Sequence, residues 1–203
     1  MKRKLALIGG GGHAVSLMEM MPGDVDVAGY VDVRQRDSMV VPYLGNDDEF
    51  ACRYPEMPVH IAFVMGENGS MALRKKVIDS YRNHDMPVLV AQSALVTSHS
   101  ALGRGCAVMH RAVINSATLG ECNVVNTGAI VEHGVTTGSN VFIGPGAVVC
   151  GGVTIGCNVM IGAGAVIRNN VTIADDSVIG MGSVVIKDIQ NSGVYAGNPC
   201  KKL

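Results

Sequence analysis

A repeat of six residues runs through the second half of the chain and constrains its fold more than any other feature. Counting by six from Val113 to Val185 gives thirteen positions, of which twelve are aliphatic and only Thr137 is polar. A β-strand repeats every two residues and an α-helix about every 3.6, so neither element alone produces this period. Short strands joined by turns and stacked coil upon coil do produce it. The sequence therefore predicts a parallel β-helix with the aliphatic repeat in its interior.

The repeat is irregular near its start and near its centre. It is kept from about residue 95 to Val108, and a five-residue step to Val113 then predicts a bulge or a wider first coil. Glycine often follows the repeat position directly, and we expect it to form the corners that β-branched residues cannot. Asn126 and Glu132 occupy two of these corner positions instead.

The first ninety or so residues follow a different pattern, in which short apolar runs alternate with helical ones. Strands are expected at 5–8, 25–33, 59–65 and 88–90, and helices at 13–21 and 70–81. Strands alternating with helices predict a small parallel α/β sheet. The expected organisation is an α/β domain at 1–92, a β-helix at 93–189 and a tail at 190–203.

Composition excludes several classes of function. A formal net charge of −1 gives no electrostatic reason to expect nucleic acid or an anionic membrane as partner. No apolar stretch approaches the length of a membrane span, and the apolar run that follows the basic N-terminus ends after four residues. The six cysteines show no CxxC spacing and are expected to be small buried residues in a reducing compartment. We therefore expect a soluble, cytoplasmic protein without membrane insertion and without a metal.

A glycine cluster lies between the first expected strand and helix. Gly9, Gly11 and Ala14 match a relaxed dinucleotide-binding pattern, and Asp32 follows at the distance of a ribose-binding acid. A dinucleotide needs two mononucleotide halves, and here the repeat begins after one. This half-site suits a mononucleotide portion, such as the UDP of a sugar nucleotide. The alternative is a tight turn followed by an ordinary solvated aspartate.

His13 falls within the glycine cluster, at the expected start of the first helix. It is placed to meet a phosphate or a sugar substituent, with help from the helix N-terminus. The alternative is a structural histidine at a helix start.

Several motifs, in a specific order along almost the whole chain, resemble one family. They are Gly9-Gly10-Gly11-Gly12-His13-Ala14, Tyr30-Val31-Asp32, the run from Asn126 to His133, Pro145-Gly146-Ala147, Ala174-Asp175-Asp176-Ser177 and Gly197-Asn198-Pro199. The chain is similar to the sugar O/N-acetyltransferases related to sialic acid O-acetyltransferase and to the UDP-4-amino-sugar N-acetyltransferases of the bacillosamine pathway.

The resemblance implies a Rossmann-like nucleotide-sugar-binding half-domain followed by a left-handed β-helix. It also implies a homotrimer with acetyl-CoA, the co-substrate, in the groove between two β-helices. His133 matches the catalytic base, since an imidazole can accept a proton near neutral pH. The positions implied for the nucleotide sugar are Gly11, Gly12, His13, Asp32, Val33, Gly66 and Asn126. Those implied for acetyl-CoA, mainly through backbone contacts, are Phe142, Ala163 and Met181.

Two positions depart from the family pattern. Gly134 stands where members often carry an acidic residue after the histidine, and Phe142 stands where relatives have a second histidine. Glu132 could orient His133 instead, although neighbours on a strand point to opposite sides. The irregular stretch from Asn126 to Thr137 is where we place the active site.

The reading favoured here is N-acetylation of a nucleotide-linked amino sugar, because free sialic acid offers no nucleotide to bind. O-acetylation of sialic acid or another glycan sugar, and a non-catalytic trimeric scaffold, remain alternatives. β-Helices of this kind also host zinc carbonic anhydrases, which need three histidines. His99, His110 and His133 do not show the close histidine pair that such a site requires. Cys150, at another corner position, is interpreted as structural.

Overall fold

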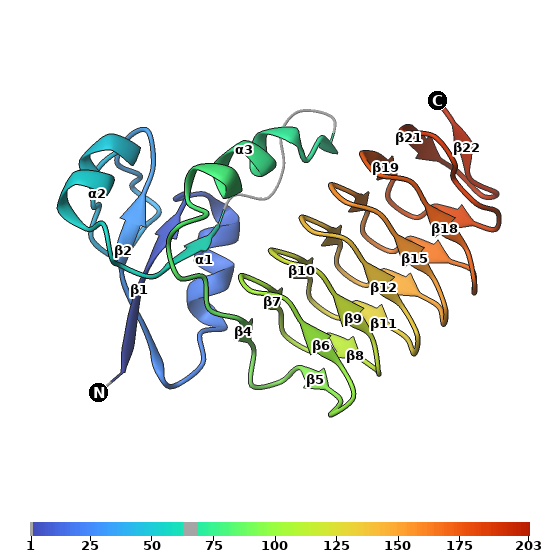
Figure 1. The fold of residues 1–203 in the computed structure, drawn as a ribbon, viewed down its shortest axis with the longest axis horizontal. Helices are drawn as coiled ribbons and strands as arrows, with labels where there is room; N and C mark the ends of the chain where they lie inside the picture. The colour runs from blue at the N-terminus through green and yellow to red at the C-terminus, as the bar shows by residue number, and fades with distance from the viewer. Residues whose placement is uncertain (1, 63–68) are drawn as a thin grey trace.

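The computed structural model describes residues 2–62 and 69–203. Figure 1 shows an α/β unit beside a prism of stacked coils that carries the C-terminus at its far end. No helix in the described part of the chain is both long and apolar enough to cross a bilayer.

The α/β unit is built on a parallel sheet with the strand order β2-β1-β3. Strand β1 spans Arg3–Ile8, β2 spans Val25–Val31 and β3 spans Val59–Ile61, with helices α1 at Gly12–Glu19 and α3 at Ala72–Ser80. These elements confirm the three strands and two helices expected here, although positions 63–65 of the third lie outside the described residues. All three strands end at the same edge of the sheet, where the glycine turn follows β1.

A third helix, α2 at Asp47–Arg53, was missed at the sequence level. Its N-terminus is a capping box: the Asn46 side chain accepts from the Glu49 N–H at 3.0 Å, and the Glu49 carboxylate accepts from the Asn46 N–H at 3.1 Å. This reciprocal pair marks a helix start. Asparagine followed three residues later by glutamate was thus a readable signal.

The expected fourth strand does not join the α/β sheet. Strand β4, Leu89–Val90, pairs in parallel with β7, Ala107–Val108, and so forms the first rung of the β-helix. The assignment of 88–90 to the α/β sheet was wrong, because a strand only two residues long is placed by its pairing partner rather than by its composition.

The β-helix has three faces, which we name by what covers or composes them. The covered sheet comprises β4, β7, β10 (Val124–Val125), β13 (Phe142–Ile143), β16 (Met160–Ile161), β19 (Ser177–Ile179), β21 (Gly193–Ala196) and β22 (Lys201–Lys202). The aliphatic sheet comprises β5 (Leu95–Val96), β8 (Val113–Ile114), β11 (Ile130–Val131), β14 (Val148–Val149), β17 (Val166–Ile167) and β20 (Val184–Val185). The threonine sheet comprises β6 (Ala101–Leu102), β9 (Thr118–Leu119), β12 (Thr136–Thr137), β15 (Thr154–Ile155) and β18 (Thr172–Ile173).

One left-handed coil contributes one strand to each sheet. Val124 pairs with Phe142 and Phe142 with Met160, so a regular coil takes 18 residues. From β7 to β20 the second residue of each two-residue strand points inward and, apart from Thr137, is almost fully buried, as at Ile143 and Ile161, both 0% exposed. The six-residue repeat is therefore the interior of the coil, as predicted.

The outward residues differ from face to face. On the covered sheet Leu89, Val124 and Phe142 are buried in one cluster with Leu5 and Leu17 of the α/β unit. The aliphatic sheet presents six aliphatic side chains outward, and no described element packs on them: Leu95, Val113, Ile130, Val148, Val166 and Val184. The threonine sheet presents exposed Ala101, Thr118, Thr136, Thr154 and Thr172.

Glycine directly after the repeat position was expected for its conformational freedom, but the structure gives a steric reason. A Cβ on Gly162 would lie 2.5 Å from the Met181 backbone nitrogen, because successive coils approach closely there. The left-handed conformation comes two residues later, at Gly164 with φ +66°, and Asn158 adopts it at the matching place of another corner. At Gly162, close approach of the next coil, and not φ, excludes a side chain.

The five-residue step in the repeat reflects a corner that is one residue shorter than the others, and not a wider coil. The buried residues are Ile114 and Leu119, and the corner between them holds only Asn115, Ser116 and Ala117 where other corners hold four residues. Val113 pairs with Ile130, so this coil has 17 residues. The prediction of a bulge at the step from Val108 was wrong, since Val113 points outward.

The two kinds of corner glycine should respond differently to substitution. Gly162→Ala should lower the free energy of unfolding by roughly 1–3 kcal/mol, the usual cost of overpacking, because its Cβ meets backbone atoms of the next coil. Gly164→Asn should change it by less than about 1 kcal/mol, because asparagine already holds this conformation at Asn158. Urea unfolding of both variants measures the difference, and equal losses would contradict this account.

Candidate functional site

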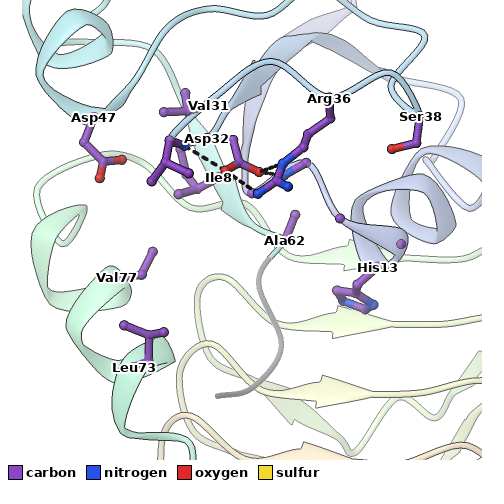
Figure 2. Close-up of a pocket in the computed structure, with 15 residues that line it drawn as sticks. Ile8, His13, Val31, Asp32, Arg36, Ser38, Asp47, Ala62, Leu73 and Val77 are labelled. Atoms are coloured by element: carbon purple, nitrogen blue, oxygen red, sulfur yellow. Dashed lines mark hydrogen bonds and ion pairs between the residues drawn. The ribbon is translucent and has the colours of Figure 1, made fainter. Parts of the chain in front are cut away.

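A pocket of about 710 Å³ opens at the carboxyl edge of the α/β sheet. Gly11, Gly12, His13, Asp32 and Val33 all line it, so the structure brings together five of the positions expected to bind a nucleotide sugar. Figure 2 shows the end of β2 and the start of α1 on one side and α3 on the other. Gly66, the sixth expected in this unit, lies outside the described residues.

The Asp32 carboxylate is held by four hydrogen bonds. The guanidinium of Arg36 donates to both oxygens at 2.9 and 3.0 Å, and the backbone N–H groups of Gly10 and Val33 donate at 3.0 and 2.7 Å. Burial raises the pKa of this carboxyl, but the hydrogen bonds from Arg36 and the backbone outweigh burial and set the pKa below its ordinary value. A carboxylate has about four acceptor positions, and all are in use. Asp32 therefore organises the pocket wall, and its expected contact with a ribose stays a prediction.

Three basic side chains lie together where the α/β unit meets the β-helix. His60 on β3 is fully buried, as is Arg74 on α3, whose guanidinium donates to the Cys122 carbonyl at 2.7 Å and to the Asn140 side chain at 2.6 Å. Burial, followed by the charge of Arg74, lowers the pKa of His13 to about 4. Burial lowers the pKa of His60 to about 3, with smaller contributions from Arg74 and His13. Both imidazoles are therefore neutral at pH 7.

His133 lies on the other unit, at the corner where the aliphatic sheet turns into the threonine sheet. Its ring covers Gly151 of the next coil: a Cβ there would lie 2.6 Å from the His133 Cε1. On the opposite side, the Asn115–Ala117 corner is the one that lacks a residue. The His133 side chain is thus exposed, with space left for it by a glycine above and a shortened turn below.

Glu132 supports the backbone at His133. Its carboxylate accepts from the Asn115 side-chain amide at 3.0 Å and from the backbone N–H of His133 at 3.3 Å. Glu132 therefore fixes the corner from which the imidazole projects. No hydrogen bond to the ring itself is present among the described residues, so a role for Glu132 in orienting the ring stays a prediction.

The positions expected to meet acetyl-CoA do not lie beside His133 in one chain. Ala163 and Met181 follow strands of the covered sheet, as does Asn126, and so occupy the corner at the opposite edge of the aliphatic sheet. Met181 is 78% exposed there. The side chain of Phe142 is 5% exposed and packs against the α/β unit, which leaves only its backbone for the expected contact.

Thr137, which interrupts the aliphatic repeat, has a structural partner. Its hydroxyl accepts from the buried Asn123 side-chain amide at 2.6 Å, and the Asn123 oxygen accepts from the Val141 N–H at 2.6 Å. The polar threonine thus satisfies a buried asparagine. Within the described ranges, no three side chains of the His, Cys, Asp and Glu types are placed to share a metal ion.

Sequence reasoning missed the three other polar side chains that line the pocket: Arg36, Ser38 and Asp47. They come from the loop after β2 and from the first turn of α2. Arg36 follows Asp32 by four residues, a spacing that permits an ion pair but does not predict one outside a helix. The Asn46 capping signal was the only guide to Asp47.

The comparisons with known proteins agree with this geometry. Residues 134–168 and 152–187 match the family described as bacterial transferase hexapeptide (six repeats). The acetyltransferase domain of PglB from Neisseria gonorrhoeae, solved in complex with acetyl coenzyme A, is 30% identical over 100% of both chains, with a TM-score of 0.90. The chain belongs to the hexapeptide-repeat acetyltransferase family.

Two other structures of this kind are informative. A variant of GDP-perosamine N-acetyl transferase from Caulobacter crescentus, in complex with CoA and GDP-perosamine, is 31% identical over 98% of this chain and 96% of that one, with a TM-score of 0.90. WeeI from Acinetobacter baumannii is 20% identical over 100% of both chains, with a TM-score of 0.76, and shares the fold. No curated protein sequence matches the chain.

The buried histidines make stability dependent on pH. Their folded pKa values, about 4 and about 3, lie below the ordinary 6.5, so the unfolded chain binds protons that the folded chain cannot. The free energy of unfolding therefore has its full histidine contribution above pH 6.5. It falls as the pH drops toward 4, by roughly 1.4 kcal/mol per pH unit for each histidine. Urea unfolding between pH 7 and pH 5 measures this slope.

His60→Leu should remove about half of that slope, because one of the two buried imidazoles is gone. The matched control is His99→Ala, at an exposed position, which should keep the slope of the unaltered protein. A His60→Leu slope equal to that of the unaltered protein would show that His60 does not titrate as described.

Proposed function

We propose that the protein transfers the acetyl group of acetyl-CoA to the amino group of a nucleotide-linked sugar, with His133 as general base. The observation that carries the proposal is the pairing of two features in one chain. A 710 Å³ pocket lies at the glycine turn of a Rossmann-like half-domain, and an exposed histidine lies at a spacious corner of a hexapeptide-repeat β-helix. The relatives solved with acetyl coenzyme A and with GDP-perosamine support this assignment.

The acceptor is assigned to the α/β pocket. Gly11 is the N-cap of α1 and offers no side-chain cap, so the first N–H groups of the helix are available to an anionic ligand. His13, neutral at pH 7, can accept or donate a single hydrogen bond from the same wall. A nucleotide bound here extends its sugar toward the β-helix, against whose covered sheet the α/β unit packs.

The catalytic centre is assembled from two chains in this proposal. The aliphatic sheet lies between the corner of His133 and the corner that carries Asn126, Ala163 and Met181. Its outward aliphatic row has no partner among the residues that the structure describes, whereas the neighbouring threonine face is mainly polar. Packing of aliphatic sheets around a symmetry axis buries this row and brings the His133 corner of one chain beside the Asn126 corner of the next. The family resemblance supports three copies.

For this reaction the protein must position the amine beside the thioester and supply a general base. As the neutral amine attacks the thioester carbonyl, a nitrogen–carbon bond forms, the carbon–sulfur bond breaks, and the amine must lose a proton. The His133 imidazole accepts that proton and returns one to the departing thiolate. Backbone N–H groups at the two corners can stabilise the developing oxyanion. Glu132, bound to the His133 backbone and to Asn115, holds the base in place.

Release of free thiol from acetyl-CoA tests the function directly. UDP- and GDP-linked 4-amino-4,6-dideoxy sugars should support thiol release, and free sialic acid should not. Turnover with sialic acid alone would favour O-acetylation. Absence of turnover with every acceptor, together with absence of acetyl-CoA binding by calorimetry, would favour a non-catalytic scaffold.

Removal of the base should act on the chemical step. His133→Ala should lower kcat by roughly 10²–10⁴-fold with little change in KM, as expected for loss of a general base. Steady-state kinetics by thiol release measures both constants. His99→Ala, another exposed histidine of the β-helix, serves as control and should retain full activity. Near-normal turnover in His133→Ala would remove His133 from this role.

A charge on the aliphatic sheet should dissociate the assembly. Val148→Glu places a carboxylate in the row that the proposal buries between chains, so the protein should become monomeric and lose activity. Thr154→Glu places the same charge on the threonine sheet and should leave both unchanged. Light scattering coupled to size-exclusion chromatography measures the mass. Intact trimers of Val148→Glu would place the interface elsewhere.

A further inference from the structure

Arg36 is the one arginine or lysine among the described residues that line the pocket. We propose that Arg36 binds the diphosphate of the nucleotide-linked acceptor and thereby selects sugars joined to a nucleoside diphosphate over free sugars. This inference rests on the proposed function and assigns a residue that neither the sequence pattern nor the family resemblance singled out.

The arginine is fixed before any ligand arrives. Its Nε and Nη2 donate to the Asp32 carboxylate, and its side chain is 35% exposed. Its backbone N–H donates to the Tyr30 hydroxyl at 2.6 Å, and that hydroxyl donates to the Arg36 carbonyl at 3.3 Å. Side chain and backbone are therefore both held, and little conformational entropy remains to be lost on binding.

The fixed guanidinium still has donors for a ligand. A guanidinium carries five N–H groups, and the two bonds to Asp32 leave Nη1 and one hydrogen of Nη2. No described residue accepts from Nη1. This remaining edge matches two oxygens of a phosphate, which an arginine binds in a bidentate manner.

The Arg36 side chain lies beside the glycine turn that leads into α1. Its Cγ lies 3.1 Å from where a Cβ on Gly10 would stand, so the side chain crosses directly over the glycine turn. The uncapped start of α1 follows that turn at Gly12. In Figure 2 Arg36 reaches from the loop after β2 toward Asp32, to which dashed lines join it. A diphosphate on the glycine turn thus meets backbone N–H groups and a guanidinium edge.

The charge of the pocket favours a phosphate over a base or a ribose as the partner. Asp32 and Asp47 both line the pocket as carboxylates, and His13 is neutral at pH 7 because its pKa is lowered to about 4. A diphosphate brings further negative charge into this wall, so it needs the cation. A nucleobase or ribose is neutral and gains far less from it.

Calorimetric titration of the full-length protein separates these possibilities. The probes are UDP, UMP and uridine, and in parallel GDP, GMP and guanosine. Arg36→Ala should weaken nucleoside diphosphate binding roughly 10- to 100-fold, the range for a hydrogen bond to a charged group, and leave the nucleoside unchanged. Lys75→Ala removes the cation of another i,i+4 ion pair, exposed on α3, and should change neither.

Equal losses for nucleoside and nucleoside diphosphate would overturn the proposal, because Arg36 would then contact the base or ribose. Unchanged diphosphate affinity would overturn it as well. If Arg36→Ala does not fold, Arg36→Gln, neutral and of similar length, is judged by the same criteria. Failure of every nucleoside diphosphate to bind the unaltered protein would overturn this inference and the proposed acceptor site. Intact nucleotide binding without turnover would contradict only the proposed function.

Discussion

The close contact between successive coils is the interaction on which the rest of the structure depends. Each coil donates its strand hydrogen bonds to the next in parallel register, as from Val124 to Phe142 and from Phe142 to Met160. Because the backbones touch at the corners, any side chain there must project outward or be absent. Corner positions are thus the places where the fold can carry outward-pointing functional side chains, and both His133 and Asn126 lie at corners.

The interior of the β-helix was predictable because its signal is repeated many times. Almost every inward position is occupied by an aliphatic residue, so the period survives a local exception such as Thr137. The α/β unit was predictable in outline, since its strands and helices carry the usual apolar alternation. Strand β4 was misplaced and α2 was missed, because two-residue strands and short polar helices are decided by pairing and capping rather than by hydrophobic pattern.

The candidate site was predictable only in part. The glycine turn, His13 and Asp32 were found from spacing and do line one pocket. Arg36 was not found, because the geometry that fixes it depends on Tyr30 and on a loop conformation that no local pattern encodes. The structural cause of the five-residue step likewise could not be predicted from the sequence. Only the pairing of Ile114 with Val131 shows that the missing residue lies beneath His133.

The shortened corner also marks one coil of the β-helix, the coil next to His133, from which positions along the long axis can be counted. From His133, the same edge of the β-helix passes Gly151, Asn169 and Lys187 in successive coils, each step about 4.8 Å in length. Equivalent positions along this edge are therefore separated by whole multiples of the coil spacing, which is about 4.8 Å. Deleting one 18-residue coil beyond His133 would shorten the edge by about 4.8 Å and leave the interior pattern in phase. The length of this edge is therefore set by the number of repeats in the sequence.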